Sequence, residues 1–173
     1  MEANYRRAQK LLDVTAPWTV DFDNPYMDFK KTVTMDKLIN LNKSEDKDLK
    51  YYSGTIRYSS TFDLDAKPAG TLYINLHEVH MMAKVKINGH YAGGVWTSPH
   101  RLDITDFVKV GKNTVEVEIV NTWANRVIGD MNLPENERKI WMLHNGWSKD
   151  SPVPDSGLVG PVVLETVTYP AVK

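Results

Sequence analysis

The feature that most constrains this sequence is the alternation of apolar and polar residues from Gly54 to Leu64. The apolar members share one face of an extended chain: Ile56, Tyr58, Phe62 and Leu64. The other face is polar: Thr55, Arg57, Ser59, Thr61 and Asp63. Because successive side chains of a strand point to opposite sides, this period of two predicts a β-strand with one face against a core.

The same period recurs roughly every 10 to 15 residues, the spacing typical of all-β folds. The further apolar sets are Trp18, Val20 and Phe22; Leu72, Ile74 and Leu76; Val85 and Ile87; Leu102 and Ile104; and Val115, Val117 and Ile119. Turn residues separate them, above all Asn88-Gly89, which tolerates the positive φ angles of a type I′ hairpin. We therefore predict a jelly-roll-like β-sandwich of mostly antiparallel strands, ending in a strand from Pro161 to Val167.

Two segments depart from this rhythm. Residues 2–12 place Tyr5, Ala8 and Leu12 at helical spacing, which predicts a short helix in a lead-in segment, 1–16, ahead of one sandwich domain, 17–173. The stretch 122–157 shows no sustained alternation but carries Trp123, Trp141 and Trp147. Since tryptophans argue against disorder, we expect one long ordered loop there.

Composition removes several functional classes. The formal net charge of the 173 residues is −1 and the pI is about 6.5, whereas nucleic-acid binders concentrate positive charge. Cysteine is absent, so no disulfide, thiolate nucleophile or cysteine zinc site is expected. The mixed charges of 43–50 indicate a solvated loop. Neither the apolar core of a signal peptide in Met1–Arg7 nor the roughly 20 apolar residues of a membrane span is found, so we expect a soluble chain without a membrane partner.

Several motifs resemble the galactose-binding-like sugar-binding domain of glycoside hydrolase family 2. They are Tyr51–Tyr58, Leu76–Val79, Val85–Gly89, Gly94–Trp96, Leu102–Asp106 and Gly111–Thr114. Two later motifs, Val120–Asp130 and Pro154–Val162, more closely resemble the C-terminal module of family 106 α-L-rhamnosidases. The resemblance spans about residues 17 to 167.

The resemblance implies a galactose-binding-like jelly roll attached to a catalytic barrel that holds the paired acids of the parent hydrolase. Nothing in this chain aligns with that barrel. The resemblance therefore implies a non-catalytic accessory module with two partners: a plant or microbial carbohydrate and the catalytic domain of an α-L-rhamnosidase-like parent. It also implies a periplasmic or extracellular location.

The candidate carbohydrate site lies in the long loop. A sugar presents an apolar face and a rim of hydroxyl groups, so its binder needs an aromatic platform beside polar and charged groups. Five residues supply those types and are predicted to close one wall of a sugar pocket: Trp123, Asn125, Arg126, Asp130 and Trp141. The alternative is that the tryptophans pack, while the polar members bond loop carbonyls or pair with one another.

Other chemistry-bearing residues favour structural roles, so no catalytic residue, metal or cofactor is expected. Asp103 and Asp106 flank a turn, where aspartate bonds its own backbone. Glu116 and Glu118 share the solvated face of a strand, and Glu135 and Glu137 follow Asp130 in the loop. His77 and His80, three apart beside a strand, would point to opposite sides and not share a metal. Trp96 is expected in the core.

Three hypotheses remain open. An accessory module of a glycoside hydrolase requires an apolar docking patch. An autonomous carbohydrate-binding module requires an exposed aromatic platform, with dissociation constants near the millimolar range that correspond to about −4 kcal/mol. A purely structural domain requires that all the loop tryptophans are buried.

Overall fold

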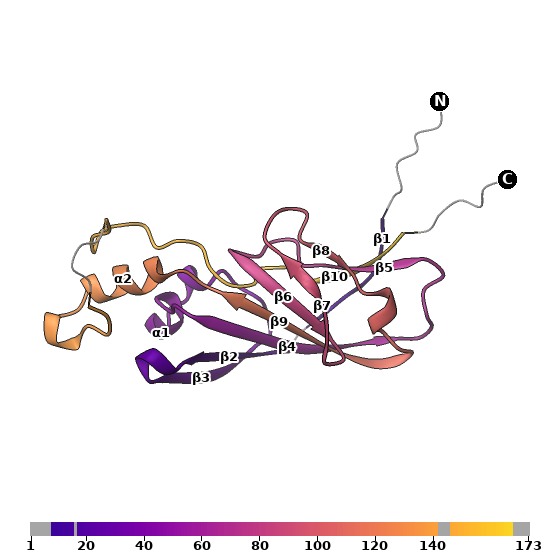
Figure 1. Ribbon diagram of the computed structural model, residues 1–173, viewed down its shortest axis with the longest axis horizontal. Helices are drawn as coiled ribbons and strands as arrows, with labels where there is room; N and C mark the ends of the chain where they lie inside the picture. Colours follow the sequence, from indigo (N-terminus) through magenta and orange to yellow (C-terminus); the bar gives the residue numbers. More distant parts are fainter. Residues whose placement is uncertain (1–7, 16, 142–145, 168–173) are drawn as a thin grey trace, which may run out of the picture.

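The computed structural model describes residues 8–15, 17–141 and 146–167, which form a sandwich of two antiparallel β-sheets (Figure 1). The four-stranded sheet has the order β1-β10-β5-β8, built from β1 (Gln9–Asp13), β10 (Val163–Val167), β5 (Thr71–Asn75) and β8 (Arg101–Asp103). The six-stranded sheet has the order β3-β2-β4-β9-β6-β7, built from β3 (Phe29–Met35), β2 (Trp18–Asn24), β4 (Thr55–Leu64), β9 (Gly111–Val120), β6 (Met82–Ile87) and β7 (His90–Val95). The predicted all-β sandwich is confirmed.

Short helices fill the connections. They are α1 (Lys47–Lys50) and α2 (Trp123–Met131), with the 3-10 turns η1 (Pro25–Met27), η2 (Leu41–Lys43), η3 (Thr105–Phe107) and η4 (Glu135–Glu137). The end of the long axis that carries α2 also carries the turn between β2 and β3, while β1 lies toward the other end (Figure 1). None of the described helices is long and apolar enough to cross a membrane.

The predicted alternation places the apolar faces of both sheets inside. In the six-stranded sheet, Val20 pairs with Tyr58, which pairs with Val117, and all three are fully buried. Trp18 is only 1% exposed. Burying a tryptophan removes about 150 to 250 Å² from water, worth roughly 4 to 6 kcal/mol before entropic costs. The period-two pattern therefore fixes both the strands and their register against the core.

The turn between β6 and β7 confirms the predicted hairpin. Asn88 and Gly89 have φ angles of 52° and 81°, as a type I′ turn requires. The Asn88 side chain also donates to the Phe107 carbonyl at 2.9 Å and to Asn113 Oδ1 at 2.8 Å. The same asparagine therefore sets the turn and ties it to the neighbouring connection.

The prediction of a helix over residues 2–12 is wrong where the structure describes them. Residues 9–13 form strand β1, in which Gln9 pairs with Thr166 and Asp13 with Val163 of β10. The edge of β10 offers backbone partners to this segment, and tertiary pairing overrides a weak helical pattern of three apolar residues. Residues 2–7 lie outside the described residues.

The long excursion is partly helical, not a loop throughout. After Thr122, its next nine residues form α2, whose inward face carries Ala124, Val127 and Ile128. The mixed-charge segment 43–50, expected as a loop, likewise contains α1, whose Leu49 is buried. In both segments a few apolar side chains at helical spacing are enough to dock a short helix on the sandwich.

The segment 153–160 returns the chain from the excursion to β10 along the sandwich. Leu158 forms an isolated bridge with Val79, and its N–H donates to the buried Tyr58 hydroxyl at 3.2 Å. Asn40 donates to an Asp155 carboxylate oxygen at 2.7 Å, and this bond is the main reason that the pKa of Asp155 is lowered. These contacts anchor the far end of the excursion to the core.

Candidate functional site

A pocket of about 200 Å³ opens at the α2 end of the sandwich and is bordered by Trp123. It is formed where five elements meet: the end of β2, η1, the start of β4, the end of β9 and the start of α2. Two aromatic side chains on its border are open to solvent, Tyr26 with 91% and Trp123 with 55% of its surface exposed. Two exposed aromatic rings at one opening offer apolar surface that a ligand or a partner can cover.

Buried amides hold the pocket together. Asn24 donates to the Ser53 carbonyl at 2.7 Å, and its Oδ1 accepts from Tyr26 N at 3.1 Å to cap η1. Asn121 donates through its side chain to the Tyr52 carbonyl at 2.8 Å. The Ser53 hydroxyl donates to the carbonyl of Thr122, the residue before α2. These bonds fix the start of α2, and with it Trp123, against the segment that leads into β4.

The chemistry of the pocket suits a polyhydroxylated ligand. The rings of Trp123 and Tyr26 offer apolar faces, while Asp23 adds an exposed carboxylate and Thr55 a half-buried hydroxyl. Stacking of an apolar sugar face on a ring with hydroxyl contacts at its edge uses this combination. Trp123 was predicted from the sequence. Tyr26 and Asp23 were not, because they lie about 100 residues earlier, in η1 and at the end of β2, and no sequence signal links them to α2.

The three polar residues predicted for the site are engaged in holding α2 and its excursion. Asn125 is fully buried and donates to the Pro154 carbonyl at 2.9 Å. Asp130 is also fully buried, and its Oδ1 accepts from Arg126 Nε at 2.8 Å. Its Oδ2 accepts from the backbone N–H groups of Lys139 and Ile140, both at 2.9 Å. These contacts agree with the alternative interpretation, in which the three polar side chains stabilise the excursion.

Trp141 occupies a different pocket. It is 84% exposed and borders a hollow of about 300 Å³ that α2 and the segment after η4 enclose, with Val127, Arg138 and Ile140 among its lining. This hollow and the Trp123 pocket share no lining residue. The structure thus does not bring the five predicted residues into one pocket: two tryptophans border separate hollows, and the three polar residues of α2 line neither of them.

The expectation that Trp96 packs in the core is wrong. Its side chain is 73% exposed, because it follows Val95, the last residue of β7, and the alternation that buries Val95 turns Trp96 to the outer face. On the same face Met82 pairs with Val120, and these side chains are 57% and 43% exposed. These three exposed residues are called the apolar rim.

The remaining chemistry-bearing residues make structural contacts. Asp103 accepts from the Thr105 N–H at 2.9 Å, as expected of an aspartate at a turn. Glu116 and Glu118 form ion pairs with Lys86 and Lys84. Among the carboxyl groups of the described residues, the pKa shifts that stand out, those of Asp46 and Asp155, are both downward, opposite to the raised pKa of a general acid in glycoside hydrolysis.

The two histidines make separate bonds. His77 Nδ1 lies 3.0 Å from the Pro161 carbonyl, and His80 Nε2 lies 3.1 Å from Glu78 Oε1. Within residues 8–15, 17–141 and 146–167, no group of three or more histidine, aspartate or glutamate side chains is arranged to hold a metal ion.

Comparison with known proteins identifies the fold more closely. Residues 28–127 match the family model described as glycosyl hydrolase 2 galactose-binding domain-like. A protein of Formosa agariphila named "Putative beta-glucuronidase" is 34% identical over 87% of this chain. A rhamnosidase structure from Novosphingobium sp. PP1Y is 32% identical over 95% of the chain, with a TM-score of 0.86. A β-D-glucuronidase of Dictyoglomus thermophilum, 19% identical with a TM-score of 0.62 over 96% of the chain, shares the fold.

The chain spans only a small part of these proteins. It corresponds to 15% of the Formosa agariphila protein, 16% of the rhamnosidase and 29% of the Dictyoglomus thermophilum enzyme. The match to the glycosyl hydrolase 2 galactose-binding domain-like model and the similarity to part of a rhamnosidase confirm the resemblance inferred from the motifs.

Proposed function

Because the chain belongs to the glycosyl hydrolase 2 galactose-binding domain-like family, we propose that it is a non-catalytic accessory module that positions carbohydrate and packs against the catalytic domain of a glycoside hydrolase. The observation that carries the proposal is the Trp123 pocket, where two exposed rings flank a carboxylate and a hydroxyl. The names of its relatives make α-L-rhamnosides and β-D-glucuronides the first carbohydrates to test.

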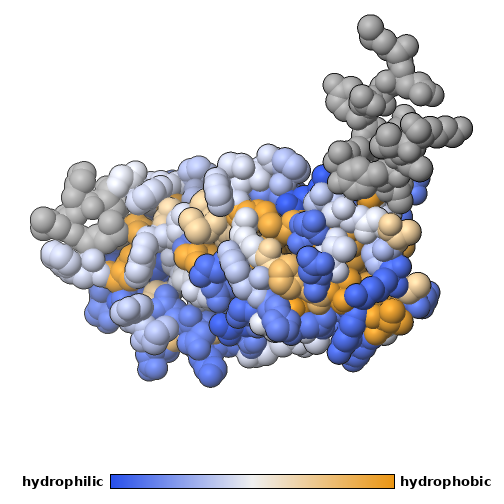
Figure 2. Space-filling view, turned by 45° about the vertical axis from the view of Figure 1, so that its right-hand side comes forward, coloured by the Kyte–Doolittle hydropathy of each residue, from blue (hydrophilic) through white to orange (hydrophobic). Residues whose placement is uncertain are grey.

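The apolar rim supports the packing role. On the face shown in Figure 2, apolar side chains form a broken band between hydrophilic ones, which predominate along the lower edge. The rim residues Trp96, Met82 and Val120 are solvent-exposed although each could be polar without loss to the core. A catalytic domain that covered them would recover the free energy of burying this apolar surface, about 25 cal/mol per Å².

A purely structural role is less consistent with these exposures. That hypothesis required buried tryptophans in the excursion, yet Trp123, Trp141 and Trp147 are 55%, 84% and 42% exposed. An autonomous carbohydrate-binding module is the second candidate, because it requires the same exposed aromatic platform. The two candidates differ in the affinity of the chain on its own.

The test is a titration of the isotope-labelled chain with rhamnose, galactose, glucuronic acid and plant oligosaccharides, followed through amide and indole NMR signals. We expect saturable shifts at Trp123 and at the amides around Tyr26, with a dissociation constant near 1 mM, about −4 kcal/mol. Trp123→Ala should abolish these shifts, whereas the control Trp96→Ala, which removes an exposed tryptophan outside the pocket, should leave them unchanged.

Shifts that survive Trp123→Ala, or no shifts at tens of millimolar sugar, would remove carbohydrate contact from the proposal. The chain should also leave p-nitrophenyl α-L-rhamnoside and p-nitrophenyl β-D-glucuronide uncleaved. Hydrolysis that persists through purification would contradict a non-catalytic module.

A further inference from the structure

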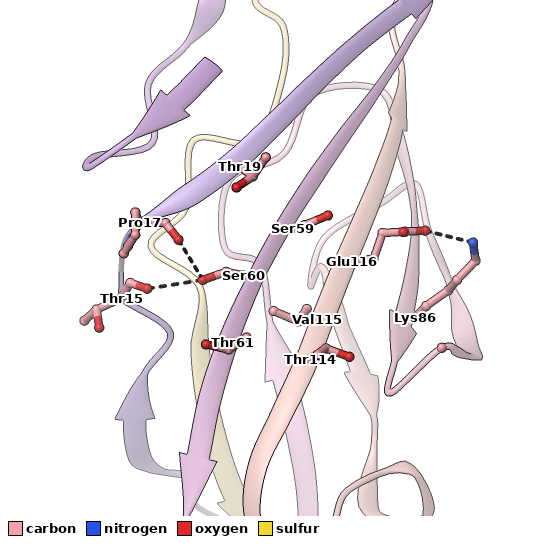
Figure 3. Close-up of a pocket in the computed structure, with 11 residues that line it drawn as sticks. Thr15, Pro17, Thr19, Ser59, Ser60, Thr61, Lys86, Thr114, Val115 and Glu116 are labelled. Atoms are coloured by element: carbon pink, nitrogen blue, oxygen red, sulfur yellow. Dashed lines mark hydrogen bonds and ion pairs between the residues drawn. The ribbon is translucent and has the colours of Figure 1, made fainter. Parts of the chain in front are cut away.

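The outer face of the six-stranded sheet carries a hollow of about 620 Å³ that crosses β2, β4, β9 and β6 (Figure 3). It shares no lining residue with the Trp123 pocket or the Trp141 hollow. Its surface is made mainly of short hydroxyl side chains: Thr19, Ser59, Thr61 and Thr114, with Lys86 and Glu116 at one side. It is called the hydroxyl trough below.

The strand register explains why the face is hollowed there. One cross-strand row consists of the charged residues Asp21, Arg57, Glu118 and Lys84, and β4 contributes to it the long side chain of Arg57. Two residues further along the strands, the next row begins with Thr19 and Ser59 and ends with the ion-paired Glu116 and Lys86. The following row pairs Thr61 with Thr114. The change from long to short side chains leaves the trough open.

One wall of the trough is held in place by Ser60. Its hydroxyl lies 3.4 Å from the Thr15 carbonyl and 3.2 Å from the Pro17 carbonyl, and donates to them (Figure 3). Thr15 and Pro17 precede β2 and both line the trough. The concavity therefore has a floor formed by β2, β4, β9 and β6 and a side fixed by the connection between the two sheets.

The charge of the trough selects against ionic ligands. Lys86 Nζ donates to Glu116 Oε1 at 2.8 Å, and Arg57 Nε lies 3.7 Å from Glu116 Oε2. These cations already face a carboxylate, so an anion finds little free positive charge, and a metal ion finds a single carboxylate that is itself paired. The exposed hydroxyl groups of Thr19, Thr61 and Thr114 remain, and each can both donate and accept a hydrogen bond.

We propose that the hydroxyl trough is a second carbohydrate-binding site, which holds a short uncharged oligosaccharide across the strands through hydroxyl hydrogen bonds, without the aromatic platform that the Trp123 pocket offers. Sugar hydroxyls also donate and accept, so rows of threonine and serine hydroxyls complement them. With strands about 4.8 Å apart, the three gaps between β2 and β6 span about 14 Å, room for a few sugar units. This site goes beyond the proposed function, because it would bind glycan on the sheet face independently of Trp123.

The test is an NMR titration of the labelled chain with cellohexaose, xylohexaose and mannohexaose. We expect saturable shifts at the amides of 59–61 and 114–116 with at least one probe. The double variant Thr61→Val and Thr114→Val keeps the shape and strand preference of both exposed residues but removes two hydrogen-bonding groups, and should weaken binding about tenfold. Ser59→Arg, which restores a long side chain to the row, should abolish it.

Thr166→Val, which removes a half-buried hydroxyl from β10 in the other sheet, is the matched control and should bind as the parent chain does. Shifts confined to Trp123 and Tyr26 would overturn the trough while supporting the proposed function. Shifts in the trough without a response at Trp123 would support the trough and leave the first site without a ligand. No shift at 59–61 or 114–116 with all three probes at tens of millimolar, or binding that the double variant leaves unchanged, would overturn the inference.

Discussion

Replacing Asp130 by asparagine is expected to destabilise the protein by about 3 to 5 kcal/mol, the cost of removing one partner of a buried ion pair. The Asp130 side chain is fully buried, and that of Arg126, its partner, is 14% exposed. An amide fits the same space but leaves the guanidinium without a counter-charge. It also weakens the two bonds from the Lys139 and Ile140 backbone N–H groups. Because domains are stable by only about 5 to 15 kcal/mol, this is a large fraction.

Urea unfolding followed by tryptophan fluorescence measures the effect. With a slope of about 2 kcal/mol per molar urea, the midpoint should fall by about 1.5 to 2.5 M. Asp106→Asn, at an exposed aspartate of η3, is the control and should leave the midpoint within about 0.3 M. Adding Arg126→Gln to Asp130→Asn should recover part of the loss, since it removes the uncompensated charge. A loss below about 1 kcal/mol for Asp130→Asn would refute the structural role assigned to this carboxylate.

Three further predictions concern the segment 153–160. Gly157→Ala should cost about 2 kcal/mol or more in urea unfolding, because its φ is +89° and a Cβ would lie 2.5 Å from the Tyr58 hydroxyl; a smaller cost would mean that the segment shifts freely. Tyr58→Phe should cost about 1 to 3 kcal/mol and accelerate hydrogen exchange at the Leu158 amide, which loses its acceptor. The hydrogen bond from Asn40 lowers the pKa of the Asp155 carboxyl group. The stability that this carboxylate contributes is therefore complete above its ordinary pKa of about 4 and is lost as pH falls through the lowered value. Urea midpoints measured from pH 5 to 2 should show this loss, and Asp155→Asn should flatten the pH dependence.

The central strands were predictable because the alternation of apolar and polar residues in the sequence matches the alternation of buried and exposed side chains in the structure. In β4 and β9, a residue on the wrong face would put a charge in the core, so alternation is enforced at every position. Asn88-Gly89 was equally predictable, since few residue pairs adopt two positive φ angles at low cost. Where the same requirement, such as burial of one face, applies to every residue of an element, the element can be predicted from the sequence.

The two segments that were predicted wrongly, α2 and residues 9–13, have weaker local sequence signals. In α2 the apolar residues Ala124, Val127, Ile128 and Met131 follow helical spacing, and a search for the period of 3.6 residues would have found them. The helix was hidden because its buried face also holds Asn125 and Asp130, polar residues whose burial is explained only by partners elsewhere in the chain. For residues 9–13, the partner strand lies some 150 residues later, beyond any local pattern.

The binding surfaces could not be predicted in full, because surface position leaves little trace in a single sequence. Trp96 was expected inside and is outside, since one position of register decides which face it takes. The hydroxyl trough consists of polar positions on ordinary strands, and only the register of four strands shows that the short side chains lie side by side. Tyr26 and Trp123 border the same pocket only because the tertiary fold brings η1 and α2 together.

The exposures of these aromatic rings limit what the module can do unaided. A ligand that covered about half of the Trp123 surface would remove roughly 100 Å² from water, worth about 2.5 kcal/mol. Similar coverage of Tyr26 would add about 2.5 kcal/mol, and two or three hydroxyl contacts about 1 kcal/mol each, while association costs at least about 4 kcal/mol. The balance of about 3 to 4 kcal/mol at most leaves binding near the millimolar range or weaker. Such affinity is of little use to a freely diffusing binder. When the module is linked to a catalytic domain that already holds the glycan, contact between the module and that glycan becomes intramolecular, at millimolar effective concentration. The energetics of the Trp123 pocket therefore favour an accessory module over an autonomous one.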